Sequence, residues 1–199
     1  MAYIALGAAG FLVGALFDWV SLRGGRGLKP ALWLVHCALI VYPSVMLSLE
    51  SDRFPLPSWA MGIGWVGLFA SIILLLHALF VNLPLKKTYI ASIGRRELVV
   101  SGAYALVRHP GFMWFGFSLV SLVLVSGSRL LLLALPLWML LDALWIGFQE
   151  KFIFDKLFDG YDAYARETPM LIPNRKSVAA FVSSLRHSKG VSKTNARIP

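Results

Sequence analysis

Five long runs of apolar residues dominate this chain and restrict its possible folds more than any other feature. A helix needs about 20 predominantly apolar residues to cross the hydrocarbon core of a membrane. A chain of 199 residues is too short to wrap five such helices in a soluble shell. The sequence therefore predicts an all-α integral membrane protein with five transmembrane helices, at residues 2–22, 31–49, 58–85, 112–126 and 130–148.

The composition agrees with a membrane protein and excludes several other classes. Apolar residues make up 58% of the chain and charged residues 15%, against about 45–50% and 25% in soluble domains. The single cysteine, Cys37, excludes a disulfide scaffold and a cysteine-rich metal site. His36 and His77 do not have metal-ligand spacing, so no metal is expected. We expect one membrane-embedded domain over residues 1–185 and a basic, flexible tail over residues 186–199.

The basic residues are distributed unevenly along the chain. With five spans, 17 of the 19 Lys and Arg residues fall on one side of the membrane, and only Arg53 and Arg129 fall on the other. The positive-inside rule then predicts a multi-pass protein with its N-terminus outside and its C-terminus in the cytoplasm. The net charge of +9 is thereby explained by membrane lipids as partners, with no nucleic acid.

The linker before the fourth apolar segment carries polar residues suited to a site. Arg108 and His109 come directly before Pro110, which favours the first turn of a helix. The free N–H groups and positive dipole end of a helix start suit a carboxylate or a phosphate. A structural interpretation also stays open, in which Arg108 anchors the helix at the membrane surface and His109 caps it.

A second polar segment follows the fifth apolar run. Glu150 stands at its start, and apolar residues then recur at helical spacing at 153, 154, 157, 158 and 161. This pattern predicts an interfacial amphipathic helix that ends at Gly160. Residues 168–173, bounded by prolines, predict an extended strip that lies back against the cytoplasmic surface. By itself, Glu150 could be solvated or paired with a nearby cation.

These two segments together resemble a known family. Residues 98–104, followed by Arg108-His109-Pro110, resemble the cofactor motif of the isoprenylcysteine carboxyl methyltransferase-like membrane enzymes, which include phospholipid and thiol methyltransferase relatives. The second half of the family pattern resembles Gln149-Glu150, Phe158, Tyr161, Tyr164 and residues 168–173. The resemblance covers about residues 94–173.

The resemblance implies S-adenosylmethionine as cofactor, in a pocket formed by the cytoplasmic linker and the C-terminal amphipathic helix. The chemistry agrees with this placement: the cofactor has a carboxylate for Arg108, His109 and the helix start, and cationic groups for Glu150. Its adenine suits aromatic walls such as Tyr104 and Phe112. The residues that the resemblance places in the pocket are Leu98, Val99, Tyr104, Arg108, His109, Pro110, Gly111, Phe112 and Glu150.

The chain departs from the family pattern at three positions. Phe112 replaces a tyrosine, Gln149 replaces a glutamate, and Ile146 stands where the prenylcysteine enzymes have an arginine that meets the substrate carboxylate. Asp142 lies one further turn into the membrane, on the same helix face. These departures disfavour a carboxylate acceptor and favour a neutral or amine acceptor, unless Arg108 or another arginine replaces the missing cation.

The resemblance implies methyl transfer to a lipophilic small molecule or a lipid-linked acceptor that enters from the bilayer. The candidate catalytic residues are Asp142 and Glu150, as bases, and Arg108. Asp142 also has a structural interpretation, because a buried acid can be protonated or bridge helices. Two other functions stay open: an NADPH-dependent membrane reductase of the sterol or steroid reductase type, and a non-catalytic lipid-binding membrane protein.

Overall fold

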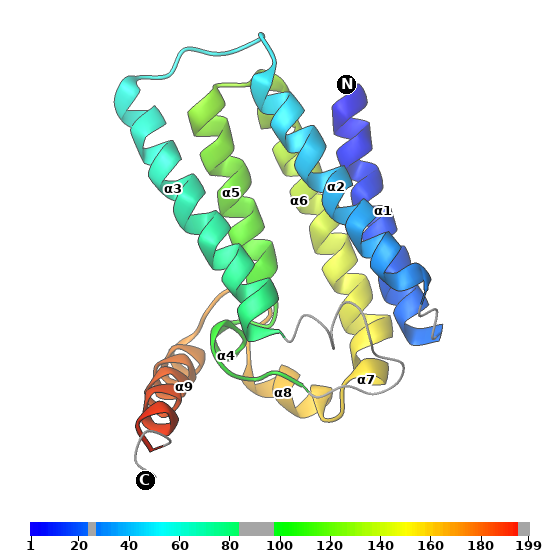
Figure 1. Cartoon of the computed structure of the whole chain (residues 1–199), viewed down its shortest axis with the longest axis vertical. Coiled ribbons are helices and arrows are strands. Elements are labelled where there is room, and N and C mark those ends of the chain that lie inside the picture. Colours follow the sequence, from blue (N-terminus) through cyan, green and yellow to red (C-terminus); the bar gives the residue numbers. More distant parts are fainter. Residues whose placement is uncertain (24–26, 84–97, 195–199) are drawn as a thin grey trace.

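The computed structural model describes residues 1–23, 27–83 and 98–194, with side chains described as far as residue 185. Within these ranges the chain is helical and contains no strand. Its main body consists of the helices α1 (Ala2–Arg23), α2 (Leu28–Leu49), α3 (Ser58–Leu76), α5 (Pro110–Ser126) and α6 (Arg129–Phe148). Figure 1 shows these helices side by side, with their axes roughly parallel and the chain alternating in direction from one helix to the next. The sequence prediction of helices in these five regions is confirmed.

Four helices in the described ranges are long and apolar enough to span a membrane: Ala2–Arg23, Leu28–Leu49, Ser58–Asn82 and Arg129–Leu157. The helix α5 is also apolar but has 17 residues. The length and composition of these helices are therefore compatible with a multi-pass membrane protein. The third predicted span reached residue 85, and residues 84 and 85 lie outside the described part.

Two helices continue beyond their regular part in widened, π-helical turns. The helix α3 passes into η1 (His77–Asn82), and α6 passes into η3 (Gln149–Ile153). Such turns are frequent at functional sites. The second of them carries Glu150, so it determines where that carboxylate points.

A buried apolar cluster joins the helices. Trp138 on α6 is fully buried, and its indole N–H donates to the carbonyl of Ile4 on α1 at 3.1 Å. The indole ring also lies so close to Gly7 that a Cβ there would collide with it. A small residue at this point lets the two helices approach closely. The members of the cluster are Phe11, Leu47, Leu119, Val123, Leu131, Ala134 and Trp138.

The two loops at one end of the helical array bind each other. The amide of Phe54 donates to the carbonyl of Gly127 at 2.9 Å, and Arg129 pairs with Asp52 at 3.0 Å. Gly127 has a left-handed backbone (φ 64°) that lets the chain turn between α5 and α6. These bonds join the loop between α2 and α3 to the turn between α5 and α6.

Four further helices gather at the opposite end of the array, as Figure 1 shows. They are α4 (Ala103–Leu106), α7 (Phe154–Leu157), α8 (Tyr161–Glu167) and α9 (Arg175–Thr194). The predicted amphipathic helix before Gly160 is present as η3 and α7, and Gly160 (φ 76°) makes the turn into α8.

The helix α9 was not predicted from the sequence. Its first turn has a reciprocal cap, because Asn174 Oδ1 accepts from the Ser177 amide at 2.9 Å while Ser177 Oγ accepts from the Asn174 amide at 3.0 Å. The helix runs into the stretch 186–199, where the sequence predicted a flexible tail. Side chains of that stretch, and residues 195–199 entirely, lie outside the described part, so the tail stays a prediction.

Candidate functional site

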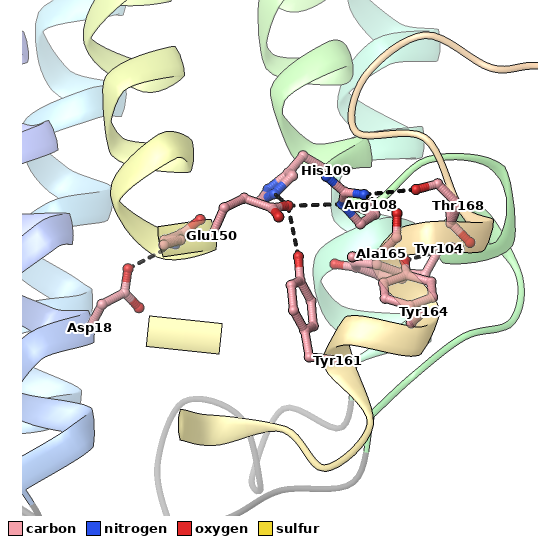
Figure 2. Close-up of polar contacts among 10 residues, drawn as sticks. Asp18, Tyr104, Arg108, His109, Glu150, Tyr161, Tyr164, Ala165 and Thr168 are labelled. Atoms are coloured by element: carbon pink, nitrogen blue, oxygen red, sulfur yellow. Dashed lines mark hydrogen bonds and ion pairs between the residues drawn. The ribbon is translucent and has the colours of Figure 1, made fainter. Parts of the chain in front are cut away.

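Three side chains from distant parts of the chain converge on one oxygen of Glu150. Its Oε1 accepts hydrogen bonds from Arg108 Nε at 2.9 Å, His109 Nε2 at 2.8 Å and the Tyr161 hydroxyl at 2.7 Å. Figure 2 shows the donors arranged around the carboxylate, between η3 and α8. An oxygen that accepts three donors, one of them a guanidinium, is that of an ionised carboxylate. The cluster is therefore held together by a partly buried negative charge.

Arg108 and His109 are positioned by the start of α5, which they directly precede. Pro110 occupies the first helical position, where its missing N–H costs nothing, and it keeps His109 out of the helical conformation (φ −121°, ψ 66°). The amides of Arg108 and His109 donate to the carbonyls of Pro169 and Met170, at 2.9 and 3.2 Å. Residues 168–173 thus contact this pair, but they form a series of bends where the sequence predicted an extended strip.

Arg108 also links the cluster to the C-terminal segment. Its Nη1 donates to the carbonyls of Ala165 at 2.6 Å and Thr168 at 2.9 Å. A second connection joins α8 to α4, because the Tyr164 hydroxyl donates to the carbonyl of Tyr104 at 2.7 Å. Arg108 and Tyr164 together hold α8 over the linker (Figure 2).

Aromatic rings enclose the cluster. The His109 ring stacks on Phe154, with centroids 5.6 Å apart and planes 16° from parallel. Phe154 in turn meets the edge of Tyr161 at 5.1 Å. His109 is 8% exposed. These rings keep water from most of the His109–Glu150 contact and so strengthen it.

Sequence analysis counted Tyr161 in the apolar helical pattern, and both Tyr161 and Tyr164 in the family resemblance, but gave neither a role in the site. Burial raises the pKa of Tyr161, and its hydrogen bond to Glu150 raises it further. Burial also raises the pKa of Tyr164, against the lowering effect of Arg108. Both phenols therefore remain neutral hydrogen-bond donors. Because Glu150 lies eleven residues before Tyr161 across a chain reversal, no helical spacing could have revealed their contact.

A second polar contact lies on the other side of α4. Gly102 has a left-handed backbone (φ 61°), and its amide donates to Ser184 Oγ on α9 at 3.2 Å. Asn82, at the end of η1, lies against Gly102, and its buried Nδ2 has no hydrogen-bond partner among the described residues. An unsatisfied amide next to the linker is a donor that a ligand could use.

The remaining predicted pocket residues surround this region with apolar surface. Tyr104 lies on α4, while Pro110, Gly111 and Phe112 form the first turn of α5. Leu98 and Val99 are half-buried and lie in irregular chain before Gly102. The structure thus brings Arg108, His109 and Glu150 into direct contact, and the other members contribute backbone, apolar or aromatic surface nearby.

Asp142 is not part of the cluster. It lies on α6 two turns before Glu150, which is about 12 Å along a helix. It is 8% exposed, and in the ranges that the structure describes its carboxyl has no hydrogen-bonding partner. Ile146, between the two acids on the same face, is also buried. The three residues form a strip that runs from the cluster into the apolar part of α6.

Gln149 makes contacts different from those of Glu150, the next residue in the chain. Its amide nitrogen donates to Asp18 Oδ2 on α1 at 2.7 Å, and Trp145 donates to the same oxygen at 2.8 Å. The end of α6 is thus tied to α1 through Gln149, while Glu150 faces the linker and α8.

Comparisons with family models, with curated proteins and with solved structures find no match to this chain. Within the described residues, no group of three or more His, Cys, Asp or Glu side chains could hold a metal ion.

Proposed function

We propose that the chain is an S-adenosylmethionine-dependent methyltransferase that acts on a lipophilic acceptor at the cytoplasmic membrane surface. The observation that carries the proposal is the contact of Arg108 and His109 with Glu150, 42 and 41 residues apart in the chain. These are the residues in which the two halves of the sequence resemble the membrane methyltransferases. Their convergence on one carboxylate supports a common site for both halves.

The proposal includes five membrane spans, with α5 as the fourth. Its 17 residues give a length of about 26 Å, close to the roughly 30 Å of a hydrocarbon core. It lies between α3 and α6 in Figure 1. With five spans, the end of the array that carries α4, α7 and α8 lies on the side of the 17 basic residues. That side is then the cytoplasm, and the N-terminus lies outside.

The donor and acceptor groups of the site fit this cofactor. All three bonds to Glu150 end on Oε1, and no described residue bonds Oε2. That oxygen is available to the ammonium or sulfonium group. The side chain of the N-cap residue His109 makes no capping hydrogen bond at the start of α5. The amides of Gly111 and Phe112 and the remaining Arg108 nitrogen therefore suit the carboxylate.

When bound, the cofactor supplies an electrophilic methyl group on a positively charged sulfur. The contribution of the chain is then to bind, to align and to exclude water. Glu150 orients the cationic end because Arg108, His109 and Tyr161 fix its position. The segment α8, held by Arg108 and Tyr164, covers the site from the aqueous side.

Asp142 is our candidate for the base that accepts a proton from the acceptor. Its carboxyl is buried and has no partner among the described residues, and an acid at such a depth is costly without a role. The strip that contains Ile146 has no cation for an acceptor carboxylate. We therefore propose a neutral or amine acceptor that reaches the site from the bilayer.

Replacing Asp142 tests this assignment. We expect Asp142→Asn to lower the turnover of labelled methyl transfer into lipid extracts by about 100-fold or more, with little change in cofactor affinity. Asp52→Asn is the matched control, because Asp52 is exposed at the other end of the array. Equal turnover in the Asp142 variant and the control would give Asp142 a purely structural role.

A thermal-shift measurement separates the proposal from a reductase. S-adenosylmethionine should raise the Tm of the purified protein, since a ligand that binds only the folded state stabilises it. NADPH should not. A shift with NADPH alone would contradict the methyltransferase proposal.

A further inference from the structure

One helix at the site end of the protein has an apolar side that nothing in the described part of the chain covers. Val178, Val182 and Leu185 of α9 are 45%, 40% and 46% exposed. Their spacing of four and three residues places them on one side of the helix. Ile172, just before α9, is 82% exposed. We call Ile172, Val178, Val182 and Leu185 the apolar edge.

A neighbouring side of α9 attaches the helix to the rest of the protein. Ser177 is buried, and Ser184 Oγ accepts from the Gly102 amide at 3.2 Å. These two serines are seven residues apart and therefore lie on the same face. Because α9 is fixed to α4 by that face, the apolar edge is held outward.

The charges of α9 have a single sign. Within Arg175–Thr194 the sequence contains five basic residues and no acidic residue. Arg175 and Lys176 in the first turn are exposed. A helix with an apolar side and only basic charges suits a surface that is both apolar and negative. The five basic residues are Arg175, Lys176, Arg186, Lys189 and Lys193.

The basic charge of α9 and the candidate membrane spans of the protein favour a membrane over other occupants. Figure 1 shows α9 outside the array of long helices, at the end where α4 and α8 lie. In the described ranges four helices can span a membrane, and the ends of membrane-spanning helices lie near the bilayer surface. An anionic headgroup layer offers the complementary charge at about 1 kcal/mol per Lys or Arg near the surface.

We propose that α9 is an interfacial helix whose apolar edge inserts into the headgroup region of an anionic leaflet. The proposal concerns membrane contact and is independent of the methyltransferase assignment. A protein partner or a second copy of the chain would instead leave the apolar edge out of contact with lipid.

A fluorescent label on α9 of the full chain tests the proposal. Cys37 is the only cysteine, so a Cys37→Ala background allows single labels. We would place an environment-sensitive dye on Val182→Cys, in the apolar edge, or on Ala180→Cys, which is exposed on a different side of the helix. Each labelled protein is reconstituted in nanodiscs of phosphatidylcholine alone, or of phosphatidylcholine mixed with phosphatidylserine.

In the discs with phosphatidylserine we expect a blue-shifted emission from position 182. We also expect several-fold stronger quenching by lipids that carry a spin label near the headgroup. The label at position 180 should keep the emission of a dye in water. Arg175→Glu with Lys176→Glu should reduce the response at position 182.

A label at position 182 that resembles the label at position 180 in both discs would overturn the proposal. An equal response in neutral and anionic discs would overturn its electrostatic basis.

Discussion

At the scale of single residues, the important feature is that one carboxylate oxygen serves three donors. Glu150 Oε1 is bound by Arg108, His109 and Tyr161. The sequence identified Arg108, His109 and Glu150 from motif resemblance. It gave no role to Tyr161, because contacts across a chain reversal depend on how η3, α7 and α8 are arranged.

Tyr161→Phe removes one donor and leaves the ring in place. We expect a loss of about 1.5–3 kcal/mol in the free energy of unfolding, because the lost hydrogen bond is made to a charged group. Chemical denaturation of the variant and of the wild type in detergent measures this difference in unfolding free energy. Tyr42→Phe on α2 is the comparison, because its hydroxyl bonds the neutral Tyr3 side chain; we expect it to lose only about 0.5–1.5 kcal/mol. Identical stability of Tyr161→Phe and the wild type would mean that the hydroxyl does not hold Glu150.

The raised pKa of Tyr161 gives this bond a pH dependence with a defined sign. In the unfolded chain tyrosine ionises near pH 10, while in the folded protein the phenol stays protonated to higher pH. The stabilising effect is therefore complete below about pH 10 and declines as the pH rises beyond it. The difference between the wild type and Tyr161→Phe should follow this course.

At the scale of elements, sequence periodicity and length were enough to locate the long apolar helices. The observed α1, α2, α5 and α6 agree with the predicted segments to within a few residues at each end. The widened turns η1 and η3 were not predicted, since nothing in the apolar pattern distinguishes them from regular helix. The helix α9 was missed because its polar composition resembles that of a flexible tail.

Alanine substitutions at three glycines distinguish the cost of a left-handed backbone from the cost of a steric clash. Gly102 has a positive φ and lies against Asn82, Gly160 has a positive φ in open space, and Gly62 lies in helix α3 in open space. We expect Gly102→Ala to cost the most unfolding free energy. Gly160→Ala should cost about 1–2 kcal/mol for its left-handed backbone, and Gly62→Ala should be neutral or stabilising by up to about 1 kcal/mol.

Thermal unfolding of the three variants gives their order directly. If Gly102→Ala were as stable as Gly62→Ala, the turn that leads into α4 would not have the conformation described here.

At the scale of the whole molecule, the distribution of basic residues predicts an orientation. The fold places α4, α7 and α8 at one end of the helical array and the loop between α2 and α3 at the other (Figure 1). That loop contains Arg53. Sequence reasoning could assign sides to these ends only by counting spans. That count depends on α5, whose 17 residues are fewer than in the other long helices.

Single cysteines at the two ends test the number of spans. In a Cys37→Ala background, Ser51→Cys lies before α3 and Lys156→Cys follows α6; both positions are exposed. With α5 as a span, three helices separate them, so they lie on opposite sides. A membrane-impermeant maleimide applied to intact cells should label only Ser51→Cys. Labelling of both positions, or of neither, would mean that α5 does not cross.

Cofactor binding by the purified protein is the most direct test of the central claim, that Arg108, His109 and Glu150 form a site for S-adenosylmethionine. Isothermal calorimetry should show binding to the wild-type protein and to Asp155→Asn, a matched acid-to-amide change at an exposed position of α7. Glu150→Gln should bind at least about tenfold more weakly, which corresponds to about 1.4 kcal/mol. Binding of equal strength to Glu150→Gln and the wild type, or no binding to the wild type, would contradict the claim.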